Sequence, residues 1–335
     1  MSRKINIALG FDKNYLPYAG TTIKSILETN KENEIHFYIM IDNSINIIDI
    51  FFLKRMIEKS DKSVEFINMK KRFKNLDTNG WSIAMYYPLV LSSLCNDEKV
   101  LFLDSDIIVT GDLTELYNTN LEGYLCGAVR DYGLITYINN NSKAKIHNNK
   151  QMSICKYFTD IRKWNKEDLK KYCNSGMLLF NLNEMRKNNT EKQMLKVIKE
   201  GALMFPDQDC INICCQEKIK ILPMQYNFQI MVPNIYNGIY ENDKIEYTSW
   251  LSSTETLPLI IHYLAKPWKE TQEIHFRKLY YQYKNKTIWK FHIDKILRKK
   301  LLRLKFSEKE SYLYILNKKI LHFGKTNSEA SSLHF

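Results

Sequence analysis

The chain has 335 residues, of which 44% are hydrophobic and 13% aromatic, so it can bury a full core in one or two domains. This composition fits an ordered globular protein and disfavours a low-complexity chain. The net charge of +12 is unevenly placed, because residues 1–270 are nearly neutral and residues 271–335 carry most of the positive charge.

The first residues, MSRKINIAL, do not resemble a secretory signal peptide, because their apolar run is short and no small-residue cleavage site follows. No window approaches the roughly 18 apolar residues of a membrane span. The seven cysteines contain no C-x-x-C pair, which disfavours a zinc or redox site. A reducing cytoplasm is therefore the expected compartment.

Strands and helices are predicted to alternate over the first 70 residues. Apolar runs predict strands at 5–9, 35–41 and 64–69, and helical spacing of apolar residues predicts helices at 18–29 and 47–58. This order is typical of an α/β protein with a mainly parallel sheet covered by helices.

The first strand runs into a polar turn, GFDKNY, at residues 10–15. In open α/β sheets such turns form the ligand crevice. Asp12 could accept a hydrogen bond from a base or ribose, and Tyr15 could stack on a flat ring or simply pack. Equally, Asp12 or Asn14 could cap the following helix.

The segment VLFLDSDIIV, residues 100–109, reads as a strand buried on both faces. It carries Asp104 and Asp106 on either side of Ser105. An extended chain would point both carboxylates to one side, where their oxygens suit Mg²⁺ or Mn²⁺ and a substrate phosphate. The alternative is that Asp104 caps a turn and Asp106 is solvated.

Two stretches are less regular. Residues 83–94 show a helical pattern, with a kink or boundary expected at Pro88. Residues 133–165 are rich in Asn, Lys and Tyr, with weak periodicity, which is typical of a disordered segment or a functional lid. The lid interpretation predicts ordering over a bound ligand.

A strand is predicted at 172–182, with Asn174 and Gly176 at its start. Gly176 would let a ligand or another backbone come close. An amphipathic helix is predicted at 184–201.

Asp207, Gln208 and Asp209 stand where the next helix should begin. Carboxylates there could simply favour the positive end of the helix dipole. Gln208 adds nothing as a cap, so a ligand-contacting role is also open. Another apolar strand ends at His262, followed by Lys266 in a Lys-Pro-Trp turn.

His262 could be a structural histidine, or it could complete a carboxylate-rich Mn²⁺ site through its neutral imidazole. Lys266 could meet a phosphate as a point charge.

Four pieces in this order resemble glycosyltransferase family 8: LGFDKNY, VLFLDSDIIVTGDLTELY, YCNSGMLLFNL followed by FPDQDCIN, and IHYLAKPW. The resemblance is to bacterial lipooligosaccharide α-galactosyltransferases and lipopolysaccharide core glucosyl- and galactosyltransferases, and it covers about residues 3–270. It implies a GT-A fold, with a Rossmann-like, mixed, mainly parallel sheet covered by helices. It also implies a UDP-hexose donor, Mn²⁺ or Mg²⁺, and retention of the anomeric configuration.

The resemblance also implies roles for individual residues. The expected metal ligands are Asp104, Asp106 and His262. The residues expected to contact the nucleotide and diphosphate are Asp12, Asn14, Tyr15, Ser105 and Lys266. The residues expected around the donor sugar are Asn174, Asp207 and Gln208, the last two at catalytic positions.

The chain departs from the family pattern at two places. Pro88 stands where the family often has Arg, and the segment between His262 and Lys266 lacks two residues and a Gly. A contact to the donor sugar or phosphate is therefore expected to be lost or moved. Gln208 is a poor nucleophile, which favours attack on the leaving-group face over double displacement.

The predicted organisation is a GT-A domain at 1–270 and a basic amphipathic, helical region at 271–335. That region is expected to lie on the anionic inner face of the cytoplasmic membrane, which makes the enzyme cytoplasmic and peripheral. The alternative is a helix packed back on the main domain.

The expected function is transfer of galactose or glucose from a UDP-sugar to an oligosaccharide or lipid-linked acceptor, in lipopolysaccharide, lipooligosaccharide or other cell-surface glycan synthesis. Competing hypotheses are a basic membrane- or nucleic-acid-binding protein with a vestigial sugar site, and a UDP-sugar hydrolase. No nucleic-acid partner is expected, because the basic residues are interleaved with apolar ones.

Overall fold

The computed structural model describes residues 4–70, 72–73, 76, 78–146, 150–231, 241–253, 255–270 and 272–292. It describes the backbone alone at 166, 241, 242, 302–306, 311–315 and 318–323. The chain divides into two compact units, residues 1–265 with 274–290, and residues 266–273 with 291–335. The first unit carries all of the predicted site residues except Lys266.

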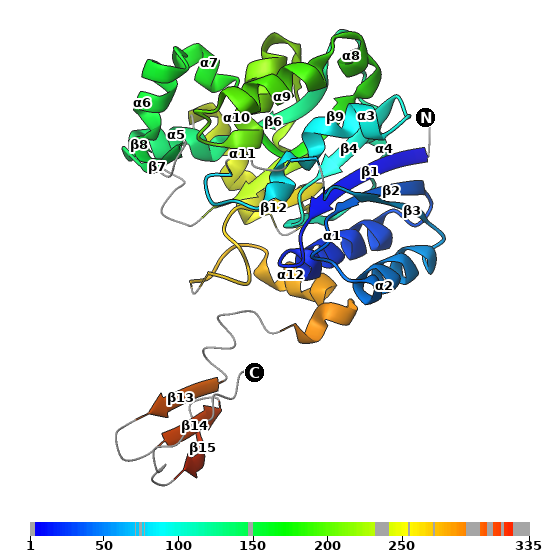
Figure 1. Cartoon of the computed structure of the whole chain (residues 1–335), viewed down its shortest axis with the longest axis vertical. Coiled ribbons are helices and arrows are strands. Elements are labelled where there is room, and N and C mark those ends of the chain that lie inside the picture. The colour runs from blue at the N-terminus through cyan, green and yellow to red at the C-terminus, as the bar shows by residue number, and fades with distance from the viewer. Residues whose placement is uncertain are drawn as a thin grey trace. The chain divides into compact units, whose positions relative to one another are not determined.

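A seven-stranded sheet in the order β10-β6-β9-β4-β1-β2-β3 forms the centre of the first unit (Figure 1). Its strands are β1 Lys4–Phe11, β2 Glu34–Ile41, β3 Ser63–Asn68, β4 Lys99–Leu103, β6 Cys126–Arg130, β9 Cys173–Asn181 and β10 Ile219–Ile221. Neighbouring strands are parallel, except that β9 runs antiparallel to both β4 and β6. The predicted α/β class, with a mixed and mainly parallel sheet, is confirmed.

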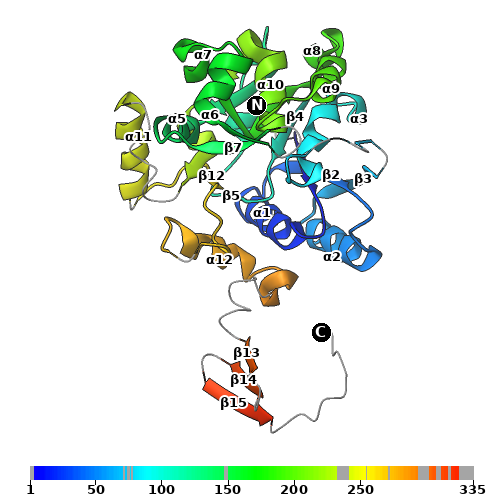
Figure 2. The same cartoon turned by 60° about the vertical axis from the view of Figure 1, so that its left-hand side comes forward.

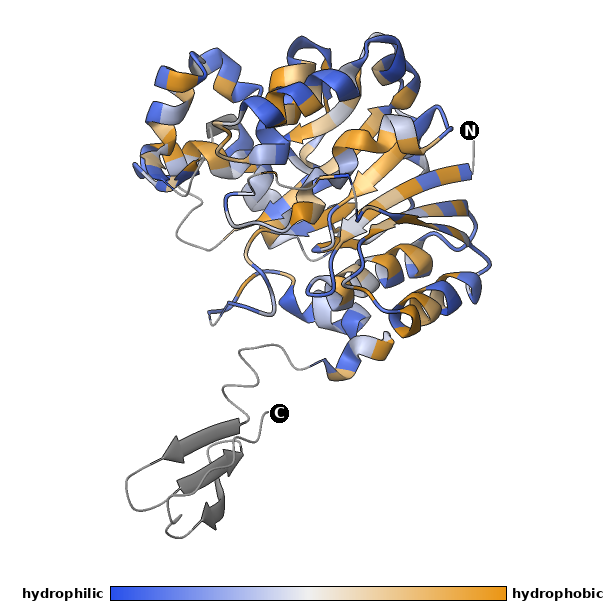
Figure 3. Ribbon diagram, viewed as in Figure 1, coloured by the Kyte–Doolittle hydropathy of each residue, from blue (hydrophilic) through white to orange (hydrophobic). Residues whose placement is uncertain are grey.

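Helices cover both faces of this sheet (Figure 1, Figure 2). One face carries α1 Leu16–Thr29 and α2 Ile47–Glu58. The other carries the 3₁₀ helix η1 Ile83–Val90 with α3 Leu91–Leu94, α8 Leu182–Lys187, α9 Thr190–Glu200 and α10 Pro206–Cys215. Apolar residues gather on the strands and on the helix faces that meet them (Figure 3).

A second sheet of three strands lies beside the end of β4. It contains β5 Ile107–Val109, β11 Phe228–Ile230 and β12 Ile260–Tyr263, in the order β11-β12-β5. The expected single strand over 100–109 is therefore wrong, because the chain leaves the first sheet after Leu103 and enters the second at Ile107. Residues 104–106 form the turn between the two sheets.

Two predicted helices are each divided in two. Residues 83–94 form a 3₁₀ helix to Val90 and a short α-helix from Leu91, so the irregularity expected around Pro88 is present. Residues 184–201 fall in α8 and α9, and the break coincides with Asn189, whose φ of 51° lies in the left-handed region.

Residues 132–170 are folded where the structure describes them (Figure 2). They form α5 Tyr132–Asn139, the hairpin β7 Lys143–Ile146 and β8 Lys150–Ser153, α6 Ile154–Lys156, the π-helix η2 Tyr157–Ile161 and α7 Lys166–Lys170. Their apolar side chains form a small core that includes Leu134, Tyr157 and Phe158. The expectation of disorder is wrong for these residues, and closure as a lid stays a prediction; residues 147–149 lie outside the described ones.

The first unit also contains α4 Thr114–Tyr117, the 3₁₀ helices η3 Gln216–Lys218 and η4 Met224–Asn227, α11 Glu241–Ser252 and α12 Arg277–Lys284, and the 3₁₀ helix η6 Ile288–Phe291 begins at its end. The segment after α12 packs on α1: a Cβ added at Gly20 would lie 2.5 Å from Trp289 Cε3, and Lys286 Nζ lies 2.9 Å from Glu28 Oε2. Trp289 is therefore a packing residue of the first unit, as the packed-back alternative predicts for this part.

The helix expected over the rest of the C-terminal region is wrong at 302–306, 311–315 and 318–323. These residues form a three-stranded antiparallel sheet of β13 Leu302–Phe306, β14 Ser311–Ile315 and β15 Lys318–Phe323. The sequence LRLKF alternates apolar and basic residues with a period of two, which suits a strand. The predicted apolar stripe at 293–300 lies outside the described residues. In the described part of the chain, no helix is long and apolar enough to cross a membrane.

Candidate functional site

Polar residues from four strands meet at one edge of the large sheet. Because β1, β4 and β6 are parallel, Asp12, Asp104 and Asp131 follow their carboxyl ends on the same side. Strand β9 is antiparallel, so its first residues, including Asn174 and Gly176, lie at that edge too. The topology therefore gathers carboxylates and amides at one place.

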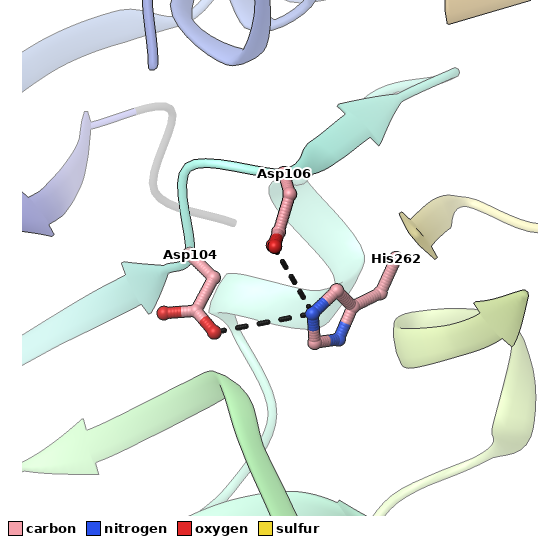
Figure 4. Close-up of side chains that lie close together, drawn as sticks. All are labelled: Asp104, Asp106 and His262. Atoms are coloured by element: carbon pink, nitrogen blue, oxygen red, sulfur yellow. Dashed lines mark ion pairs between the residues drawn. The ribbon is translucent and has the colours of Figure 1, made fainter. Parts of the chain in front are cut away.

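Asp104, Asp106 and His262 come together at the turn between the two sheets (Figure 4). His262 Nε2 lies 3.1 Å from Asp106 Oδ1 and 3.9 Å from Asp104 Oδ2. The side chains of His262 and Asp106 are 3% and 8% exposed, whereas that of Asp104 is 41% exposed. One ligand atom from each residue lies within 4.8 Å of the others, which suits one divalent cation with mixed oxygen and nitrogen ligands.

Backbone hydrogen bonds hold this turn between both sheets. The Asp104 amide donates to the Gly176 carbonyl at 2.8 Å, and the Tyr263 amide donates to the Asp106 carbonyl at 3.0 Å. A Cβ added at Gly176 would lie 2.2 Å from His262 Cε1, so only glycine leaves room for the imidazole. The close neighbour of Gly176 is therefore the side chain of His262, whereas a ligand or another backbone was predicted there.

The predicted sugar-contacting amides form one hydrogen-bonded group. Gln208 Oε1 accepts from Asn174 Nδ2 and from the Ser175 amide, each at 3.1 Å, and Gln208 Nε2 donates to Asp131 Oδ2 at 2.9 Å. Asn174 Oδ1 accepts from Asn227 Nδ2 at 2.9 Å. Asn227 Oδ1 lies 3.0 Å from His262 Nδ1, so this group is connected to the candidate metal site.

The two carboxylates at the start of α10 differ in their surroundings. Asp209 Oδ2 accepts from the Tyr157 hydroxyl at 2.5 Å and from the Met204 and Phe205 amides at 2.8 and 2.9 Å, and Oδ1 accepts from the Tyr172 hydroxyl at 2.6 Å. Asp209 thus holds α10 to the segment before it.

Asp207 is half-buried, and burial raises its pKa to about 6, partly offset by a hydrogen bond from Ser175 and by backbone amides. The hydrogen bond from Ser175 connects Asp207 to the start of β9, which also carries Asn174.

The other predicted contacts lie around the same edge. Asp12 Oδ1 accepts from the Asn14 and Tyr15 amides at 2.8 and 3.2 Å, so it holds the turn before α1. The N-cap residue of α1 is Tyr15 and no side chain caps this helix, so the helix-cap alternative for Asp12 or Asn14 is wrong. Burial, followed by the negative charges of Asp106, Asp104 and Asp12, raises the pKa of Tyr15.

Ser105 Oγ is buried and has no hydrogen-bond partner among the described residues. Asn14 is exposed, and Lys266 begins the second unit. The nucleotide and diphosphate contacts predicted for these residues stay predictions.

Two residues of this site were not singled out from the sequence. Asp131 follows β6 as Asp104 follows β4, and a carboxylate directly after an apolar strand was a usable signal. Asn227 had no such signal. It lies just before β11, whose parallel pairing with β12 brings it beside His262, and no local pattern reports that pairing.

Comparison with known proteins agrees with the resemblance seen in the sequence. Residues 6–272 match the profile of glycosyl transferase family 8. A lipopolysaccharide 1,2-glucosyltransferase of Escherichia coli is 25% identical over 331 residues, which are 94% of this chain and 86% of that protein. A lipopolysaccharide 1,3-galactosyltransferase of Salmonella typhimurium is 23% identical over 303 residues, covering 85% of this chain and 79% of that protein.

The fold is similar to that of the galactosyltransferase LgtC, solved with donor and acceptor sugar analogs. The two share 21% identity and a TM-score of 0.65, over 85% of this chain and 96% of that one. This likeness supports the predicted GT-A fold.

The raised pKa of Asp207 predicts a specific pH dependence of stability. Because the folded state holds this proton more tightly than the unfolded chain, the contribution of Asp207 to the free energy of unfolding falls as pH rises from about 4 to about 6. Asp207→Asn should flatten the pH profile in that range, measured by urea unfolding, whereas Asp160→Asn at an exposed position should leave it unchanged. Equal slopes for Asp207→Asn and the unsubstituted chain would contradict the assignment.

Proposed function

The chain belongs to glycosyltransferase family 8, and we propose that it transfers galactose or glucose from a UDP-sugar to a saccharide acceptor with retention of configuration. The observation that carries this proposal is the cluster of Asp104, Asp106 and His262, joined through Asn227 to the amides of Asn174 and Gln208. A cation site for a diphosphate thus adjoins hydrogen-bonding groups for a sugar.

Asp104, Asp106 and His262 would hold Mn²⁺ or Mg²⁺. Bound there, the cation would neutralise the negative charge that develops on the diphosphate leaving group. The exposure of Asp104 gives the diphosphate access to the cluster, while Asp106 and His262 stay fixed behind it. Lys266 is proposed to add positive charge near the phosphates, and Tyr15 to lie against the nucleotide.

The hydrogen bonds of Gln208 favour attack on the leaving-group face of the sugar. Its Oε1 already accepts two hydrogen bonds, so both lone pairs are engaged and the amide oxygen is poorly placed to attack. In the proposed reaction the bond from the anomeric carbon to UDP breaks, and a bond to the acceptor oxygen forms on the same face. The acceptor proton passes to the leaving phosphate. Gln208 orients the sugar through its remaining N–H group, whereas both N–H groups of Asn174 already donate, to Gln208 Oε1 and Asp131 Oδ2. Asn174 and Asp207 are proposed to line the sugar site beside it.

We propose that the acceptor is a lipopolysaccharide, lipooligosaccharide or other cell-surface saccharide, as the names of the two bacterial relatives suggest. Such an acceptor is lipid-linked and lies at a membrane. Residues 271–335, with their excess of Lys and Arg, would hold the enzyme at the anionic inner face of the cytoplasmic membrane.

The donor and the cation are tested together. Purified protein is screened against UDP-galactose and UDP-glucose with Mn²⁺, with and without saccharide acceptor, and UDP release and product are measured. We expect acceptor-dependent UDP release that EDTA abolishes and Mn²⁺ restores. Asp106→Asn should lose several kcal/mol of transition-state stabilisation while folded. Asp160→Asn is the matched control. Full activity in excess EDTA would exclude the cation site, and UDP release indifferent to acceptor would favour a hydrolase.

Gln208 is tested by substitution. Because it positions the sugar and does not attack it, Gln208→Ala should retain a small residual rate, and the product should keep the anomeric configuration of the donor by NMR. A covalent sugar adduct trapped on Gln208, Asp207 or Asp131 and seen by mass spectrometry would show double displacement instead.

Membrane association is tested with vesicles of rising anionic lipid content. Basic residues near such a surface contribute about 1 kcal/mol each before screening. Replacing Arg298, Lys299 and Lys300 by Gln should therefore weaken co-sedimentation strongly, and high salt should release the unsubstituted chain. The matched control replaces three exposed lysines of α9, Lys192, Lys196 and Lys199. Equal loss in both triple variants would mean that the C-terminal region has no special part in binding.

A further inference from the structure

We propose that Asn227 is a positioning residue of the cation site. It holds His262 with a proton on Nδ1, so that the Nε2 lone pair faces Asp104 and Asp106. The inference rests on the proposed function only in that the cation serves transfer. It concerns a residue with no place in the sequence-derived site, and it can be measured without any sugar donor.

The orientation of the Asn174 amide is set by the backbone. The Gly176 amide, which can only donate, gives its hydrogen bond to Asn174 Oδ1 at 3.0 Å. A flipped Asn174 would turn its own NH₂ group toward this N–H and leave a buried donor without an acceptor. Such a loss costs about 1–3 kcal/mol.

Two more groups of fixed polarity anchor the far end of the chain of amides. The Ser175 amide donates to Gln208 Oε1 at 3.1 Å, and Asp131 Oδ2 accepts from Gln208 Nε2 at 2.9 Å. Asp131 is itself held, since its Oδ1 accepts from the Gly133 and Leu134 amides at 2.9 and 3.0 Å. Turning Gln208 over would place oxygen against oxygen at one end and donor against donor at the other.

These anchors determine the orientation of Asn227. Its Nδ2 lies 2.9 Å from Asn174 Oδ1, an acceptor, so Asn227 must donate there and turn its Oδ1 toward His262 Nδ1, 3.0 Å away. Asn227 is fully buried, so water cannot replace either bond. The hydrogen bonds thus run in one direction, from His262 through Asn227, Asn174 and Gln208 to Asp131.

The consequence for His262 is a defined tautomer. An imidazole that donates from Nδ1 in its neutral form has its lone pair on Nε2, the nitrogen 3.1 Å from Asp106 Oδ1. This is the form that a divalent cation requires. Gly176 removes the steric obstacle to the ring and also orients Asn174, so one short backbone segment sets both the position and the tautomer of His262.

The first test measures Mn²⁺ affinity in the absence of donor, from the electron paramagnetic resonance signal of the free ion. Asn227→Ala removes the acceptor of the Nδ1 proton, and loss of such a partner typically weakens metal binding about 10–100-fold. Asn227→Asp keeps an oxygen that accepts from Nδ1 but sets its second oxygen against Asn174 Oδ1, so its affinity should lie above that of Asn227→Ala and at or below that of the unsubstituted chain. The matched control is Asn6→Ala. Asn6 is also buried and bridges to the Tyr117 hydroxyl at 3.3 Å, but it lies near the start of β1.

The second test reads the tautomer directly. In protein labelled with ¹⁵N-histidine and loaded with Mg²⁺, the His262 signals, identified by their loss in His262→Asn, should show a protonated Nδ1 and an unprotonated Nε2. An unprotonated Nδ1 would overturn the proposal. The proposal would also be overturned if Asn227→Ala bound Mn²⁺ as tightly as the unsubstituted chain, or if Asn227→Asp bound Mn²⁺ no more tightly than Asn227→Ala.

If Asn227→Ala does not fold, the Mn²⁺ affinity of Asn227→Asp and the tautomer of His262 in the unsubstituted chain still test the proposal. If no UDP-sugar is transferred but the Mn²⁺ affinities of the variants are as expected, the result would count against the proposed function alone. Transfer with unchanged Mn²⁺ affinity in Asn227→Ala would count against this inference alone.

Discussion

Asp106 Oδ1, a carboxylate oxygen, lies 3.1 Å from His262 Nε2, an imidazole nitrogen, and both side chains are buried. Two groups that each present a lone pair cannot stay this close away from water unless positive charge lies between them. A proton can supply that charge, and so can a divalent cation. The second carboxylate, Asp104, lies 3.9 Å from the same nitrogen and is open to solvent, which favours an ion that also meets an external ligand. The rest of the site is arranged around this requirement.

The backbone meets this requirement by passing from one sheet to another within three residues. The Asp104 amide completes a hydrogen bond to the large sheet, and the Asp106 carbonyl completes one to the small sheet. A turn held at both ends cannot relax away from His262, which stands on β12 of the small sheet. The antiparallel strand β9 begins at the same edge. Its residue Asn174 contributes a side-chain amide, and its residue Gly176 leaves room for the His262 ring.

The fold class could be predicted from local patterns, whereas the grouping of Asp104, Asp106 and His262 came from the resemblance to family 8, and the structure brings these three residues together. Asp104 and Asp106 lie in the turn after the apolar strand β4, and His262 lies near the end of the apolar strand β12. The role of Asn227 depends on pairing between β11 and β12, which no local pattern reports. Asp209 has a structural role that Asp207 lacks, because the hydroxyls of Tyr157 and Tyr172 donate to it, and both tyrosines are distant from it in the sequence. At 302–306 a period of two was present in LRLKF, but the helical interpretation of the preceding basic run was extended across it.

Position 208 shows how the same network restricts the chemistry at the sugar. Gln208 Nε2 lies 2.9 Å from Asp131 Oδ2, and its Oε1 is engaged by Asn174 and by the Ser175 amide. An ionised carboxylate at this position would face Asp131 at hydrogen-bonding distance, and two such groups cannot both stay charged without a shared proton. A neutral amide satisfies every partner at once, but it leaves no free lone pair to attack the anomeric carbon. The network that orients His262 therefore also favours an amide over a nucleophile at position 208, which supports reaction on the leaving-group face.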